Sequence, residues 1–126
     1  MNNIKFNYLY RDAGNYKKWA DIVFSNPERL TIGAITKALG GSFLADGLFI
    51  AQQVRVPEVF LSAEGGVTED DHCFHEFDSV EVSSEIPTDA HHRSIREFVA
   101  EVNREGKLGW QAFDPHVRFL RVAGPE

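Results

Sequence analysis

The chain has 126 residues, 43% of them hydrophobic and 25% charged, which is typical of a globular protein and excludes a disordered one. Its length suits one domain, residues 1–126, and no apolar run approaches the roughly 20 residues of a membrane-spanning helix. The single cysteine, Cys73, excludes an internal disulfide and a multi-cysteine zinc site. Since the N-terminus also lacks the basic and apolar regions of a secretion signal, we expect a cytoplasmic protein.

The N-terminal part predicts a β-hairpin. Residues 4–10 are rich in aromatic and β-branched side chains and predict a strand. Residues 11–15 include a glycine and an asparagine, which tolerate the positive φ of tight turns. Residues 16–24 predict the returning strand, so the chain is expected to begin with two paired strands.

Two amphipathic helices are predicted from capping signals and apolar spacing. The first is expected to begin at the Ser-Asn-Pro-Glu stretch of residues 25–28 and to run to about Leu39, before the glycine pair at 40–41. The second is expected to begin at residues 87–89 and to end at Gly106. Between these limits its apolar residues follow the i, i+3, i+4, i+7 spacing of a helix with one buried face.

The segment between the two helices is predicted less uniquely. Residues 48–51 indicate a buried strand, whose extension to Val56 the pattern leaves open, and residues 59–61 indicate a further short one, with Pro57 between them at a strand end or edge. Whether residues 42–62 form one strand or two is left open by the pattern. A last strand is predicted near the C-terminus, over residues 117–122.

Residues 74–83 predict a strand whose alternation changes phase. Phe77 belongs to a set of side chains on one face, whereas the apolar side chains from Val80 onward belong to the other. A β-bulge near Asp78 and Ser79 would reconcile the two halves, because one extra residue restores the facing.

These elements together predict an α+β fold. Strands joined by hairpins and accompanied by only two helices favour a mainly antiparallel sheet with both helices packed on one face. The regular strand–helix alternation of a doubly wound parallel sheet is not found in this order of elements.

Acidic side chains are concentrated in the middle of the chain. Residues 58–89 contain ten Asp and Glu and no Lys or Arg, a charge of −10, whereas the rest of the chain carries +4, which leaves the net charge of −6. Such a field disfavours nucleic acid as a partner and favours basic proteins or cations. The simpler interpretation is a solvated acidic surface that aids solubility.

Residues 71–78, DHCFHEFD, combine carboxylates, two histidines and a cysteine in one short stretch. On a helix, His72, His75 and Glu76 would share one side and form a candidate site for a divalent metal. On a strand, which the flanking residues favour, His75 faces away from His72 and Glu76, and the stretch is an acidic loop that leads into a strand with exposed polar residues. A Cys73 nucleophile with His75 as its base is a further hypothesis, although a lone cysteine is more often a small buried side chain.

The hairpin carries a second candidate surface, rich in aromatic and basic side chains. Such residues anchor protein interfaces and single-stranded nucleic-acid platforms, although part of the rings is expected in the core. With the neighbouring acidic loop, the candidate interaction residues are Tyr10, Arg11, Tyr16, Trp19, Asp70 and Asp71.

Three stretches of the sequence, FNYLYRDAGNYKKW, VPEVFL and DHCFHEFDSVE, resemble a family of small uncharacterised bacterial proteins. The resemblance spans most of the chain. It implies a bacterial cytoplasmic protein, and it assigns no activity and no catalytic residue to any position.

The sequence favours a non-enzymatic interaction module over an enzyme. The acidic block beside an aromatic hairpin, with no phosphate-binding loop or hydrolase motif, predicts a protein that binds a basic partner protein, as immunity or regulator proteins do. Neither nucleic acid nor a membrane is expected as a partner, and a homodimer stays open. The alternative is a small metal-dependent hydrolase that uses His72, His75 and Glu76 with a divalent metal as its cofactor.

Overall fold

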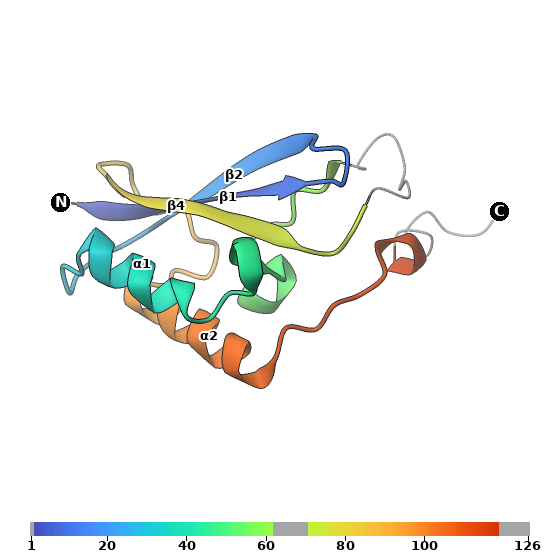
Figure 1. Cartoon of the computed structure of the whole chain (residues 1–126). Coiled ribbons are helices and arrows are strands. Elements are labelled where there is room, and N and C mark those ends of the chain that lie inside the picture. Colours follow the sequence, from blue (N-terminus) through green and yellow to red (C-terminus); the bar gives the residue numbers. More distant parts are fainter. Residues whose placement is uncertain (1, 62–70, 119–126) are drawn as a thin grey trace.

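The computed structural model describes residues 2–61 and 71–118 and has an α+β fold (Figure 1). In chain order its elements are β1 (Asn3–Arg11), β2 (Lys17–Phe24), α1 (Ile32–Gly40), η1 (Ala45–Gly47), β3 (Leu48–Phe49), η2 (Ala51–Val54), β4 (His75–Ser83) and α2 (Ile95–Leu108). The strands form one sheet in the order β2-β1-β4-β3, with every pair antiparallel. Helices α1 and α2 cover the same face of this sheet, which we call the inner face, and the opposite one the outer face (Figure 1). The predicted fold class is confirmed.

The predicted N-terminal hairpin is confirmed as β1 and β2. The two strands pair from Ile4 with Phe24 to Arg11 with Lys17. In the turn, the Asp12 N–H donates to the Tyr16 carbonyl, and the Asp12 carboxylate accepts the Tyr16 N–H at 2.9 Å. These two bonds close the turn, in which Asn15 and not Gly14 has the positive φ.

The predicted bulge in β4 is also confirmed. Tyr8 faces Phe77, whereas the preceding residue Asn7 faces Ser79, so Asp78 has no partner in the ladder. The extra residue changes the phase of the strand and turns apolar side chains on both sides of it toward the inner face.

The start of α1 differs from the prediction. The helix begins at Ile32, where the Thr31 hydroxyl accepts the Ala34 N–H, and not at residues 25–28. The side chain of Asn26 instead binds both the N–H and the carbonyl of Leu30, and Arg29 has a φ of 57°, which no α-helix accommodates. The predicted end of α1 near the glycine pair at 40–41 is confirmed.

Helix α2 is also shifted relative to the prediction. Ser94 and Glu97 form a reciprocal capping box that starts the helix at Ile95, and residues 87–89 lie in the preceding connection. Thr88 is not free to cap a helix, because it binds the backbone of β2. The helix continues through Gly106 to Leu108.

The strands predicted between the helices are mostly wrong. Strand β3 is only two residues long, and the chain then forms the helical turn η2. Arg55, with a φ of 59°, ends this turn in the left-handed region, so a strand does not continue to Val56. No strand forms at residues 59–61 either, because the Val59 N–H donates to the side chain of His75.

The predicted C-terminal strand is not seen where the structure describes it. Residues 117–118 belong to a short helical turn, and the rest of the predicted strand lies outside the described residues.

The core lies between the inner face and the two helices, and aromatic rings form its centre. The Phe6 ring lies 4.9 Å from that of Phe98 and 6.0 Å from that of Phe49, between ring centroids. Phe24 stacks on Phe98 at 4.5 Å. All four side chains are fully buried, and each such side chain contributes about 1.5–3 kcal/mol through removal from water.

Gly106 of α2 packs closely against Ser42, in the chain that follows α1. A Cβ atom at this position would lie 2.6 Å from the carbonyl oxygen of Ser42. We therefore expect Gly106→Ala to lower the free energy of unfolding by about 1–3 kcal/mol, despite the better helix propensity of alanine. Urea denaturation measures this change. Gly33→Ala in α1 is the matched control, because a Cβ there would have no atom within 4 Å beyond the adjoining residues and the backbone of its own helix, and a gain of about 0.5–1 kcal/mol is expected.

Candidate functional site

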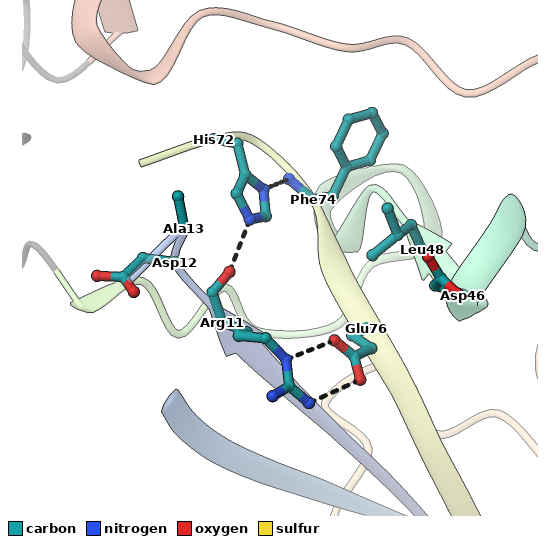
Figure 2. A pocket seen from close by; sticks show the side chains of 8 residues that line it. All are labelled: Arg11, Asp12, Ala13, Asp46, Leu48, His72, Phe74 and Glu76. Atoms are coloured by element: carbon teal, nitrogen blue, oxygen red, sulfur yellow. Dashed lines mark hydrogen bonds and ion pairs between the residues drawn. The ribbon is translucent and has the colours of Figure 1, made fainter. Parts of the chain in front are cut away.

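A pocket of about 520 Å³ opens on the outer face, beside the turn of the hairpin (Figure 2). Its lining combines four charged side chains, one histidine and three apolar side chains: Arg11, Asp12, Ala13, Asp46, Leu48, His72, Phe74 and Glu76.

Strand alternation places three of the lining residues on one side of the chain. His72, Phe74 and Glu76 are two residues apart, so their side chains share the outer face at the start of β4. Leu48 of β3 pairs directly with Glu76, and Arg11 ends the neighbouring strand β1. The pocket therefore forms where three strands end side by side.

Arg11 and Glu76, which both line the pocket, form a bidentate ion pair. The Arg11 Nε and Nη2 atoms each lie 3.1 Å from one carboxylate oxygen of Glu76 (Figure 2). A third donor of the guanidinium, on Nη1, reaches the Asn15 side-chain oxygen at 2.6 Å. The Glu76 hydrogen bond raises the pKa of Arg11, so the two charges compensate each other at neutral pH.

The hydrogen bonds of His72 define its tautomer. Its Nδ1 accepts the N–H of Phe74 at 3.0 Å and is therefore unprotonated in this arrangement. Its Nε2 must then carry the proton, which it donates to the carbonyl of Arg11 at 2.7 Å (Figure 2). His72 is thus a neutral wall of the pocket, with both ring nitrogens in use.

A tight turn carries Asp46 to the pocket. Asp46 has a φ of 63° and Gly47 a φ of 76°, and the Gly47 N–H donates to the carbonyl of Leu44. Gly47 also approaches β4 so closely that a Cβ would lie 3.3 Å from the carbonyl oxygen of Phe77. Only glycine satisfies both conditions, and its turn holds the preceding aspartate beside β4.

The pocket has an excess of negative charge. Three of its lining residues, Asp12, Asp46 and Glu76, carry carboxylates, and one, Arg11, carries a guanidinium that Glu76 already compensates. With His72 neutral, two carboxylates remain, which lie toward opposite sides of the pocket (Figure 2). Neither of them forms an ion pair with a basic side chain of the described residues.

The structure separates the three residues predicted to hold a metal. His72 and Glu76 line the pocket on the outer face, whereas His75 is fully buried on the inner face. The reason is the strand geometry of β4, which alternates faces, while the predicted cluster required a helix. Within residues 2–61 and 71–118, no group of three His, Cys, Asp or Glu side chains is arranged to hold a metal ion.

His75 is instead a buried member of an aromatic cluster. Its Nε2 accepts the Val59 N–H at 2.9 Å, and its ring meets the edge of Phe60 at 4.8 Å between centroids. Burial, and secondarily the nearby His72, lower the pKa of His75 to about 4. Its Nδ1 has no hydrogen-bond partner in the structure as described. Cys73 is buried close by in sequence, but neither ring nitrogen of His75 is bonded to its thiol.

The predicted interaction residues divide into buried and exposed ones. Tyr10 is fully buried and donates to the Asp71 carboxylate at 2.6 Å while accepting the His72 N–H. Burial, followed by the bond to Asp71, raises the pKa of this phenol. Tyr16 and Trp19 are 72% and 57% exposed and are available to a partner. Arg11 lines the pocket, and Asp70 lies outside the described residues.

Fewer acidic side chains of residues 58–89 are available to a partner than the charge of this block indicates. Of its seven acids in the described ranges, four are paired with basic side chains from other parts of the chain, and the sequence could not show these pairings. The pairs are Glu58–Arg118, Glu76–Arg11, Glu85–Lys5 and Asp89–Arg93. The unpaired acidity of the pocket comes from Asp12 and Asp46, which lie outside that block.

No family model, curated protein or solved structure matches this chain significantly. None of the helices in the described ranges has both the length and the hydropathy that crossing a bilayer requires.

Five of the eight residues that line the pocket were not among the candidates, because each is unremarkable in its local pattern. They are Asp12, Ala13, Asp46, Leu48 and Phe74. The Asp-Gly pair at 46–47 was a usable signal, since that dipeptide favours a turn and places a carboxylate at its tip.

Proposed function

We propose that this protein is a non-enzymatic binding module whose pocket receives a basic side chain, lysine or arginine, of a partner protein. The observation that carries the proposal is the pair of carboxylates on Asp12 and Asp46, which lie toward opposite sides of the pocket and have no basic partner among the described residues. A cation between them is attracted by both, and the Arg11–Glu76 pair beside them is already neutral overall.

The apolar part of the lining suits the stem of such a side chain. Lysine and arginine pack their methylene groups on apolar surfaces while the charged group stays near water or an acid. Leu48 and Phe74 provide this surface in the pocket. The exposed Tyr16 and Trp19 lie on the adjoining hairpin, and aromatic residues of this kind are common anchors at the centre of protein interfaces.

The metal-dependent hydrolase is not favoured by any observation. Its three candidate ligands lie on two faces of the sheet, and both ring nitrogens of His72 are bound to the backbone. The interaction hypothesis does not require a metal at these residues, because it is supported by the carboxylates of Asp12 and Asp46.

Nuclear magnetic resonance of the ¹⁵N-labelled protein, titrated with N-acetyl-arginine amide, tests the proposal. We expect saturable shifts of the amides of Asp46, Phe74 and Glu76, which weaken as salt is added. N-acetyl-citrulline amide is the matched probe, because it has the shape of arginine without the charge, and it should leave these amides unchanged.

Asp46→Asn removes one of the two carboxylates. Asparagine tolerates the left-handed backbone at this position, so the fold is retained while the affinity for the arginine probe falls by up to about fivefold. Glu28→Gln makes the same charge change at an exposed site remote from the pocket and should not alter the affinity. Equal shifts with the arginine and citrulline probes, or an unchanged affinity in Asp46→Asn, would contradict the proposal.

A further inference from the structure

Strand β2 leaves one edge of the sheet open. It is the end strand in the order β2-β1-β4-β3, so only one of its sides is paired within the sheet. At Val23 this free side is occupied, because the Val23 N–H donates to the Thr88 hydroxyl and its carbonyl accepts the Thr88 N–H, both at 2.9 Å. From residue 17 to residue 21, no hydrogen bond from another described residue occupies it.

The bonds of Val23 also show which backbone groups face this edge. In an antiparallel ladder, the N–H and carbonyl of one residue point to the same side, and the side alternates from residue to residue. Since both groups of Val23 point away from β1, those of Lys17, Trp19 and Asp21 do so as well. The carbonyl of Tyr16 points inward to the Asp12 N–H, which agrees with this alternation.

The exposed side chains of this edge on the outer face are a tryptophan with opposite charges at equal distances on its two sides. Trp19 pairs with Leu9 of β1, and both lie on the outer face, opposite to the buried Tyr8 and Tyr10. Two residues before Trp19 is a lysine and two residues after it an aspartate, on the same face. Lys17 and Asp21 are exposed, and neither forms an ion pair with another described residue.

We infer that two copies of this chain associate by antiparallel pairing of their β2 edges, with the two-fold axis at Trp19. In this register Trp19 faces Trp19 of the second copy, and Lys17 faces Asp21 of the second copy on each side of the axis. Each facing pair exchanges two backbone hydrogen bonds. The open stretch is five residues long, and Trp19 is its centre, so the register that uses the whole edge is also the one that pairs the charges.

The pairing joins two four-stranded sheets into one continuous sheet. It brings the two tryptophans, each 57% exposed in the single chain, beside each other on the outer face, where aromatic cross-strand pairs are stabilising. Thr88 at Val23 stops the partner strand from sliding further along the edge. The pocket keeps its own lining in this arrangement, so the inference does not depend on the proposed function.

Sedimentation velocity over a range of protein concentrations tests the inference. We expect the mass to rise with concentration from 14.2 kDa toward twice that value. Lys17→Asp and Asp21→Lys each place like charges opposite each other twice, so each variant should dimerise about tenfold or more weakly than the wild type. Circular dichroism establishes that both variants remain folded.

A mixture of the two variants gives the sharper result. The Lys17→Asp edge carries only acids and the Asp21→Lys edge only bases at the facing positions, so the two variants should form a heterodimer at concentrations at which each alone dimerises only weakly. Lys18→Asp is the matched control, because Lys18 would face Ala20 of the second copy, and it should dimerise like the wild type. A wild-type protein that stays monomeric at all concentrations overturns the inference, as does a mixture that fails to associate.

Discussion

Arg93→Leu is expected to lower the free energy of unfolding by about 3–5 kcal/mol. The Arg93 side chain is only 6% exposed, yet it is charged. It lies just before α2 and connects that helix with the chain around η2. Leucine fills part of its volume but replaces none of its hydrogen bonds.

All five N–H groups of the Arg93 guanidinium are used. Nε and Nη2 bind the two carboxylate oxygens of Asp89, each at 2.9 Å. Nη1 binds the Val54 carbonyl at 2.7 Å and Glu101 at 3.1 Å, and Nη2 also reaches the Arg55 carbonyl at 3.0 Å. Removing this one side chain therefore takes a donor from two carbonyls and from two carboxylates, of which Glu101 keeps Arg55 and Asp89 keeps only backbone donors.

The two carboxylates remain charged at neutral pH in the intact protein. Burial by itself raises the pKa of Asp89, but the hydrogen bonds from Arg93 outweigh it and hold this pKa below its usual range. The hydrogen bond from Arg55, with Arg93 in support, likewise lowers the pKa of Glu101. Without Arg93, the Asp89 carboxylate, only 1% exposed, loses its cation in a place that water does not reach.

Chemical denaturation of wild type and variant at neutral pH measures this effect. Arg104→Leu is the matched control, because the Arg104 side chain is 62% exposed, lies on α2 and forms only a long surface contact to Glu105. Its replacement should change stability by no more than about 0.5 kcal/mol. A loss of less than about 1 kcal/mol for Arg93→Leu would show that the network does not hold the connection to α2.

Acidification from pH 6.5 to pH 4 is expected to remove about 3 kcal/mol of stability through His75 alone. The unfolded chain takes up the His75 proton near its ordinary pKa of 6.5, whereas the folded chain takes it up only near about 4. Between these values the unfolded state binds more protons, so the free energy of unfolding falls as the pH falls. The magnitude follows because one pKa unit corresponds to about 1.4 kcal/mol.

Denaturation curves recorded at intervals across this range measure the slope. His75→Gln provides the comparison, since the glutamine oxygen can accept the Val59 N–H but does not titrate. The carboxylates that titrate near pH 4 are common to both proteins and cancel in the difference. If wild type and His75→Gln lose stability in parallel between pH 6.5 and pH 4, His75 does not have its lowered pKa.

The parts of the fold that could be predicted are those set by local pattern. The hairpin, the bulge near Asp78 and the end of α1 each follow from alternation or glycine position within a few residues. The starts of both helices were predicted too early in the chain, because Asn26 binds Leu30 and Thr88 binds β2. Only the second of these contacts joins residues far apart in the sequence, and the capping box of Ser94 and Glu97 was a local signal for the true start of α2. Residues 48–56 carry a strand pattern, but only Leu48 and Phe49 reach the ladder.

The candidate site shows the same limit. His72, Glu76 and Arg11 were recognised by residue type, but strand alternation sends His75 to the opposite face, and only the register of β1 against β4 brings Arg11 to Glu76. The negative charge of the pocket could not be read from the acidic block, because four of the seven acids of the block that the structure describes are paired with basic side chains, whereas Asp12 and Asp46, outside the block, form no such pair with a described residue.

Differential capture from a lysate of the native host tests the central claim, that the pocket binds a basic side chain of a partner protein. Wild type, Asp46→Asn and Glu28→Gln are immobilised in parallel, and the retained proteins are compared by mass spectrometry. We predict a basic protein that wild type and Glu28→Gln retain, that salt releases, and that Asp46→Asn retains less. Equal retention by Asp46→Asn and Glu28→Gln, or retention that salt does not affect, would contradict the claim.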